Sequence, residues 1–275
     1  MIVSAWLIDL AVVAGAAMVL PLAIGGRWWR WEVVAVSSAT ALVLPRGAVA
    51  AAFALPWVVV ACVETVAAIR VATDRRIASL TTAARSVAGG YAVVAGSALV
   101  ASRAGFEWRG IVEPIVELAA VHFTYAGAAA LVLAVEARAV VPARGVGACA
   151  VVVTAIAPPI VATGFFSAHW LPQVGGAVAM ALGVFATAAL ELARSLRRTE
   201  SRLRRLLLAA SGLSVWVPMA LAVAWAAGQH WRVPMLSIPD MVRTHGTANA
   251  LGFVACGLLA TRVLGRAGDD LELAA

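Results

Sequence analysis

The sequence has few charged residues. They make up 13% of its 275 residues, whereas 63% are hydrophobic. A soluble domain of this length buries a sizeable core but still needs a charged exterior, so the shortage of charge excludes a soluble protein. The longest polar stretches, 70–85 and 194–205, are too short to fold separately. We therefore expect a single integral membrane domain over residues 1–275.

Lysine is absent, and all 21 basic residues are arginine. They lie in short loops beside apolar spans, where anionic lipid and membrane topology account for them. No basic stripe carries interleaved aromatic residues, so we expect no nucleic-acid partner. The lack of lysine, together with abundant alanine and valine, is typical of a GC-rich bacterial genome. We expect a multi-pass protein of the bacterial inner (cytoplasmic) membrane whose partner is the lipid bilayer.

Cysteine is also scarce. The three cysteines, Cys62, Cys149 and Cys256, are widely spaced and odd in number, which excludes a disulfide framework and a zinc site. Asp9 interrupts the first apolar run and no basic segment precedes it, so no cleavable signal peptide is predicted. No motif for a metal or a cofactor is present, and we expect neither.

Apolar stretches near the roughly 20 residues that cross a bilayer recur along the whole chain. Lipid offers the backbone no hydrogen-bond partners, so each stretch must form a helix. We predict an all-α transmembrane bundle of about nine spans, or eight if the short second stretch does not cross. The expected spans are 2–24, 31–45, 48–70, 86–102, 111–136, 147–168, 174–194, 206–227 and 239–262.

The arginines predict the orientation of the bundle. With the loop 194–205 inside and nine spans, 16 arginines fall inside and four outside, as the positive-inside rule requires. The N-terminus is then outside and the C-terminus cytoplasmic. Tryptophans at both boundaries agree with this orientation, as interfacial belts do. The outer ones are Trp108, Trp170 and Trp231, and the inner ones are Trp28, Trp29 and Trp31.

The fifth span contains ionisable residues that are costly at membrane depth. Glu113 and Glu117 are one helical turn apart on one face, and His122 and Tyr125 are also a turn apart. Such a group is either a structural polar seam or a site, and Glu113 near the interface could simply be solvated.

The last span holds a second polar group. Asp240 and Arg243 are spaced for an ion pair within the helix, and His245 and Asn249 share a face. In the predicted topology this group and that of the fifth span both occupy outer halves. If the two helices are neighbours, they form one pocket. Glu64 lies in the inner half of its span, and would be separate or line the pocket floor.

Two segments of the fifth and ninth spans carry a family resemblance. They read Glu-Pro-Ile-Val-Glu-Leu-Ala-Ala-Val-His-Phe-Thr-Tyr-Ala-Gly at 113–127 and Leu-Ser-Ile-Pro-Asp-Met-Val-Arg-Thr-His-Gly-Thr-Ala-Asn-Ala-Leu-Gly-Phe at 236–253. With the stretch 218–226, they resemble the YndJ-like family of bacterial membrane proteins over about residues 110–260. The resemblance implies a site at His122, Tyr125, His245 and Asn249. It also implies a possible transport function, because the family is sometimes labelled a transporter.

Our leading hypothesis is a membrane-embedded acid/base catalyst that cyclises or isomerises a lipophilic small molecule such as a terpenoid or polyketide. Glu117 or Asp240 would donate a proton and His122 and His245 would accept or orient it. Tyr125 and Asn249 would position the substrate's oxygen, and Glu64, Glu113 and Arg243 would complete the substrate-binding set. An analogy of architecture alone links this hypothesis to integral-membrane terpene cyclases, in which Glu64 and Asp240 would be the acids.

Three alternatives stay open. The same carboxylates could form the proton relay of a small-molecule or proton-coupled transporter, although no internal repeat is seen. His122 and His245 could ligate a haem or a metal, although no redox motif supports this. The chain could also be purely structural or regulatory.

Overall fold

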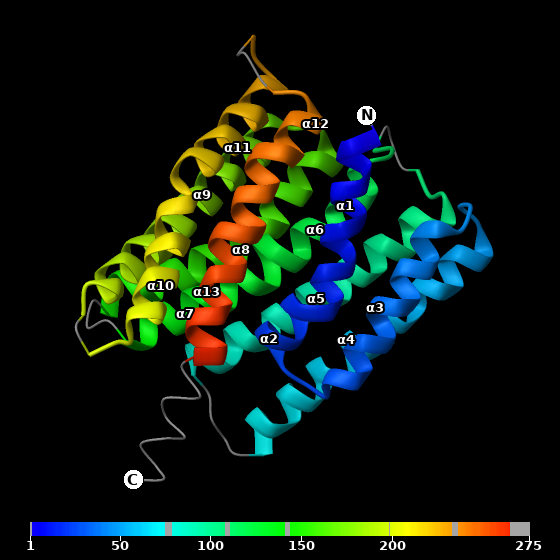
Figure 1. Ribbon diagram of the computed structural model, residues 1–275. Coiled ribbons are helices and arrows are strands. Elements are labelled where there is room, and N and C mark those ends of the chain that lie inside the picture. The colour runs from blue at the N-terminus through cyan, green and yellow to red at the C-terminus, as the bar shows by residue number, and fades with distance from the viewer. Residues whose placement is uncertain are drawn as a thin grey trace. The chain divides into compact units, whose positions relative to one another are not determined.

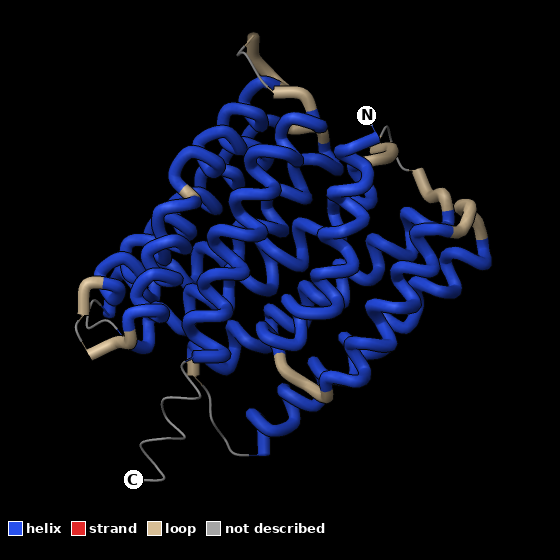
Figure 2. Tube along the Cα trace, in the orientation of Figure 1, coloured by secondary structure: helices blue, strands red, loops and turns tan. Residues whose placement is uncertain are grey.

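A computed structural model of the chain describes residues 2–74, 79–107, 111–140, 144–197, 199–232 and 236–264. Figure 2 shows helices joined by short loops and no strand in these described ranges, which confirms the predicted all-α class. In the list that follows, η marks a π-helical segment. The elements are α1 (Ile2–Ala14), η1 (Gly15–Val19), α2 (Leu20–Ile24), α3 (Trp28–Val43), α4 (Ala48–Asp74), α5 (Leu80–Ala104), α6 (Ile115–His122), η2 (Phe123–Ala129), α7 (Ala130–Val140), α8 (Arg144–Ser167), α9 (Trp170–Ser195), α10 (Arg202–Ser214), α11 (Trp216–Gly228), α12 (Ile238–Met241), η3 (Val242–Gly246), η4 (Ala248–Ala255), α13 (Cys256–Leu258) and η5 (Leu259–Val263).

Eight helical runs in the described ranges are long and apolar enough to cross a membrane. The exception among the predicted spans is α3, whose 16 residues extend about 24 Å, less than the roughly 30 Å hydrocarbon layer. The two ends of α3 nevertheless contact residues far apart along the neighbouring helices α4 and α5. Arg30 near its start bonds Glu64 late in α4, and Leu44 after its last turn bonds Arg103 at the end of α5. Helix α3 therefore lies along most of the length of its neighbours but is too short to count among the eight candidate spans, and orientation in the membrane stays a prediction.

The chain forms two compact units. The first comprises Met1–Val132 with Phe165–Ala168, and the second comprises Leu133–Gly164 with His169–Ala275. In the first unit α4 packs between α3 and α5, and α5 also contacts α6 and η2. Helix α1 lies against α3 and α6 (Figure 1). The continuous helical run α6–η2–α7 carries the chain from the first unit into the second.

Small residues allow close packing in the second unit, as is usual between membrane helices. Helix α9 contacts α10 and α11, and α10 also contacts η4 and α13. A Cβ on Gly212 would meet Leu192 and the Ala188 carbonyl of α9, and a Cβ on Gly164 would collide with the backbone of Gln173. Gly164 and Gly212 therefore allow their helices to approach until backbone atoms are in contact.

We expect Gly164→Ala to lower the free energy of unfolding in detergent micelles by about 1–3 kcal/mol, the usual cost of overpacking. The added methyl group has rigid backbone on one side and cannot be accommodated by a rotamer change. Gly175→Ala is the matched control, because no atom lies within 4 Å of its added Cβ. That variant is expected to be neutral or slightly stabilising, since alanine is the better helix former. Equal stability of the two variants would contradict this close packing.

The tryptophans only partly follow the predicted belts. Trp28 and Trp29 at the start of α3 are exposed, as are Trp170 and Trp231, whose rings pack 5.5 Å apart. Trp31 differs from these exposed tryptophans. It is fully buried, and its indole N–H donates to the Gly25 carbonyl at the end of α2 at 2.9 Å, so its depth in the membrane stays a prediction. Trp108 lies outside the described residues.

Candidate functional site

Two carboxyl groups meet near one end of the first unit. Glu117 lies in the first turn of α6 and is 7% exposed. The carboxyl group of Asp9, half-buried on α1, lies beside it. A carboxylate can only accept a hydrogen bond, so these two carboxyl groups can bond each other only when one of them carries a proton. We call these two residues the carboxyl pair.

Two arginines and a third carboxylate surround the carboxyl pair. The guanidinium of Arg103, at the end of α5, lies 3.9 Å from a Glu117 oxygen and donates to the Leu44 carbonyl at 3.0 Å. Glu113 accepts from the backbone N–H of Glu117 at 3.3 Å and lies 3.7 Å from the Arg46 guanidinium. This arrangement keeps positive charge beside the carboxyl pair, where it stabilises the anion that remains after proton donation.

Two buried atoms beside the carboxyl pair have no hydrogen-bond partner in the part of the chain that is described. They are Nε of Arg103 and Oε1 of Glu113, a donor and an acceptor. Buried polar atoms are nearly always bonded in native proteins. This donor and acceptor can therefore serve one hydroxyl group of a bound molecule, which would accept from Arg103 and donate to Glu113.

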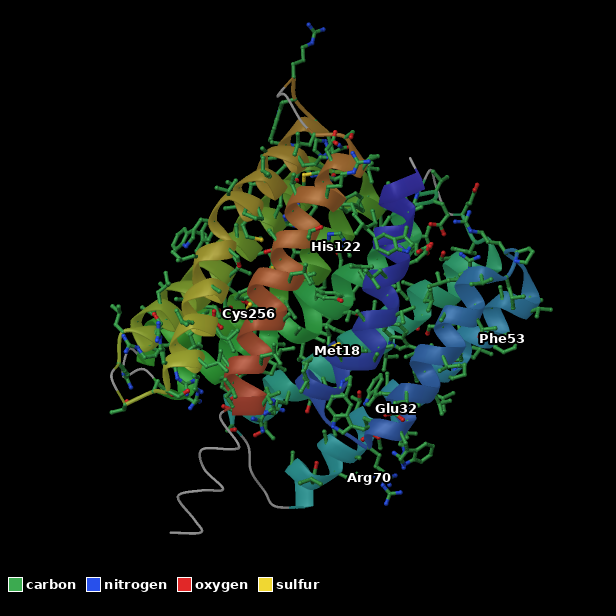
Figure 3. The ribbon with its side chains drawn as sticks, viewed as in Figure 1. Met18, Glu32, Phe53, Arg70, His122 and Cys256 are labelled. Carbon is green, nitrogen blue, oxygen red and sulfur yellow. The ribbon has the colours of Figure 1, made fainter. Side chains whose placement is uncertain are left out.

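His122 and Tyr125 lie farther along the same helical run. The Tyr125 ring is buried and its hydroxyl donates to the Ala11 carbonyl of α1 at 3.1 Å. Tyr125 and Glu117 thus both face α1. His122, labelled in Figure 3, is exposed and points elsewhere, because five residues of helix rotate it well away from the Glu117 face. Its Nδ1 lies 2.8 Å from the Leu118 carbonyl, which makes Nδ1 the donor and Nε2 the atom that bears the lone pair.

His245 and Asn249 form the predicted couple in the second unit. His245 reaches from η3 to α11, where its Nδ1 lies 2.8 Å from the Pro218 carbonyl. The Asn249 amide donates to the His245 carbonyl at 2.9 Å and lies 3.2 Å from the imidazole. As in His122, the Nδ1 contact with a carbonyl leaves Nε2 as the basic nitrogen.

Asp240 and Arg243 are a looser pair at the start of the same helical run. Their charged atoms are 3.7 Å apart and both side chains are about half exposed. Asp240 also accepts from the Ser237 hydroxyl at 2.6 Å, while its backbone N–H donates to that hydroxyl at 3.3 Å. Ser237 is thus the N-cap of this helix, and the Asp240 carboxylate holds its hydroxyl in place. The structure thus gives Asp240 a local structural role, and its predicted role as an acid stays a prediction.

Glu64 forms an ion pair with an arginine from another helix. Arg30 of α3 donates to it at 2.7 Å, and the Glu64 carboxyl group packs against Gly26, which has a φ of +96°. The carboxylate therefore neutralises an arginine where α2 turns into α3. This ion pair accounts for a charged group in the inner half of α4.

Glu191 is a second buried acid, on α9 in the second unit. The nearby Arg194 donates to Glu200 at 2.7 Å. Glu191 is 1% exposed, and the Ser211 hydroxyl of α10 lies 2.6 Å from its carboxyl group and 2.9 Å from the Phe253 carbonyl. One hydroxyl proton cannot serve both acceptors. The chain of bonds closes when a protonated Glu191 donates to Ser211 and Ser211 donates to Phe253.

The predicted site residues are divided between the two units. Five of them, Glu64, Glu113, Glu117, His122 and Tyr125, belong to the first unit, and four, Asp240, Arg243, His245 and Asn249, belong to the second. A single pocket formed by both sets stays a prediction. Within the described residues, no group of three or more His, Cys, Asp or Glu side chains could hold a metal ion.

π-Helical turns coincide with the polar motifs. Segment η2 follows directly after His122, and η3 and η4 contain His245 and Asn249. Such turns are rare in proteins and are frequent at functional sites.

The sequence model of the YndJ-like protein family matches residues 5–253. The chain belongs to the YndJ-like family. The match confirms the resemblance and extends it upstream of the predicted 110–260, to include Asp9 and Arg103 at the carboxyl pair. No curated protein and no solved structure matches this YndJ-like chain.

Proposed function

We propose that this YndJ-like chain is a membrane-embedded acid/base catalyst that cyclises or isomerises a lipophilic substrate, with the carboxyl pair as its acid. The observation that carries the proposal is the buried Glu117 carboxyl group, with Arg103 3.9 Å away and Asp9 beside it, among apolar helices. A proton held between two carboxyl groups beside an arginine is available for donation. Carboxylic acids kept neutral in apolar surroundings are established general acids.

The proposed reaction neither adds atoms to the substrate nor removes them. The carboxyl pair gives its proton to an alkene carbon or an epoxide oxygen, and the resulting cation rearranges or closes a ring. The cation then loses a proton to the carboxylate that donation left at the carboxyl pair, which restores the acid. The apolar walls exclude water that would otherwise capture the cation. The product is an isomer of the substrate.

His122 is turned away from the carboxyl pair and His245 belongs to the second unit, so their predicted role as bases stays a prediction. The base in this proposal is the carboxylate that donation leaves at the carboxyl pair. The Arg103 Nε and Glu113 Oε1 atoms would hold a substrate oxygen next to the acid.

Because the product is an isomer, the activity can be sought without knowing the substrate. Total lipid extracts of bacteria that express the wild-type chain or an empty vector would be compared by chromatography coupled to mass spectrometry. We expect a new species with the mass of a host lipid but a different retention time. It should disappear in cells expressing Glu117→Gln at equal protein level. Identical extracts from wild-type and Glu117→Gln cells would contradict the proposal.

A proton-coupled transporter is the second candidate. The buried Glu191–Ser211–Phe253 chain favours it, because a fully buried acid can carry a proton in a relay without contact with a substrate. Uptake of a small molecule into proteoliposomes, driven by a pH gradient and lost in Glu191→Gln, would support transport over catalysis.

A further inference from the structure

A groove runs along the outer side of α3 in the first unit. It has a volume of about 460 Å³ and extends from Trp29 to Thr40 on α3, with Phe53 of α4 on its other side. The 11 residues between its ends correspond to about 16 Å of helix. Figure 3 shows Glu32 near the start of α3 and Phe53 farther along the same two helices.

The two ends of the groove differ in chemistry. Trp29 and Glu32 lie at the end near the start of α3, where exposed Trp28 and Trp29 are typical of a membrane interface. Glu32 is exposed, and it is the charged residue of the groove lining. Arg27, also exposed, precedes the helix by one residue.

The rest of the groove wall suits hydrocarbon. Val33, Val36 and Phe53 are exposed apolar side chains. Ser37 and Thr40 also line it, but their hydroxyl groups donate to backbone carbonyls of α3, at 3.1 and 2.9 Å. These hydroxyl protons are satisfied inside the helix, so an acyl chain would meet no unpaired donor along the wall.

We propose that this groove binds a phospholipid whose headgroup carries a primary amine. The amine would pair with Glu32, the phosphate would lie toward Arg27, and one acyl chain would follow Val33 and Val36 to Phe53. Charge complementarity selects this occupant, because the carboxylate would repel an anionic headgroup and attract an ammonium group. The inference is independent of the proposed catalysis, since it uses none of the carboxyl-pair residues.

The test is a lipid competition on the full-length purified protein. The chain in mild detergent is mixed with equal amounts of phosphatidylethanolamine and phosphatidylglycerol of the same acyl chains, and bound lipid is counted by native mass spectrometry. We expect the wild type to retain more phosphatidylethanolamine. Glu32→Gln should reduce this preference by up to about fivefold, the upper range for an exposed ion pair. Glu107→Gln, which removes an exposed carboxylate elsewhere, is the matched control and should keep the preference.

A second variant tests the acyl-chain part of the groove. Val36 is 68% exposed, so Val36→Trp should fill the groove without disturbing the core, and it should lower the binding of both lipids. An unchanged lipid preference in Glu32→Gln would overturn the proposal, as would equal retention of the two lipids by the wild type. Unchanged lipid binding in Val36→Trp would also overturn it, because the headgroup would then bind without the groove.

Discussion

Glu117→Gln is expected to lower substrate turnover by about 10²–10⁴-fold, the usual contribution of a positioned general acid. Glutamine keeps the size of the side chain and can still bond Asp9, but its amide cannot supply the proton. The measurement is the rate of isomer formation by purified protein in lipid nanodiscs. Glu107→Gln is the control because Glu107 is exposed and lies in the loop after α5. It should leave the rate unchanged.

The same assay tests whether Asp9 and Glu117 act as a pair. If they hold one proton between them, Asp9→Asn alone should cost about as much as Glu117→Gln. The double variant should then cost little more than either single one, because residues that act as a unit are strongly non-additive. Losses that multiply in the double variant would show two independent carboxyl groups.

Glu191→Ala is expected to lower the free energy of unfolding by about 3 kcal/mol, from the cavity that it leaves and the hydrogen bond that it removes. Glu191→Gln should cost less than about 1 kcal/mol, because its amide N–H₂ can donate to the Ser211 hydroxyl, which then donates to the Phe253 carbonyl. Chemical or thermal unfolding in detergent, followed by circular dichroism, gives both values.

The variant Ser211→Ala measures the loss of the hydrogen bonds without the large cavity that Glu191→Ala creates. This variant removes the hydroxyl that joins Glu191 to the Phe253 carbonyl but leaves little empty space. We expect a loss of about 1–3 kcal/mol, the cost of unsatisfied buried polar groups. A Glu191→Gln variant as unstable as Glu191→Ala would indicate that Glu191 is charged in the folded protein, and would contradict the bonding chain inferred above.

The helices could be predicted from sequence because apolar length alone determines them. All nine predicted spans have a helical counterpart in the structure, and α3 is as short as its sequence indicated. Glu117 was also recognisable as an acid, since a carboxylate two residues into a helix among apolar neighbours is costly.

Partners distant in sequence were not predictable. Glu191 and Arg194 are three residues apart, but the tertiary fold brings Ser211 to one residue and the short loop brings Glu200 to the other. Arg30 and Glu64 are separated by 34 residues, and only packing of α3 on α4 joins them. The approach of Asp9 to Glu117 was not predictable for the same reason, because nothing in the sequence of α1 shows that α6 lies beside it.

The most direct test of the central claim uses purified wild-type protein in vesicles with the same pH on both sides. The host lipid whose isomer appears in expressing cells is added, and its conversion is followed by mass spectrometry. The account predicts isomer formation without any gradient and its loss in Glu117→Gln. Absence of conversion, with movement of the lipid or another molecule across the membrane only when a pH gradient is imposed, would contradict catalysis and establish transport.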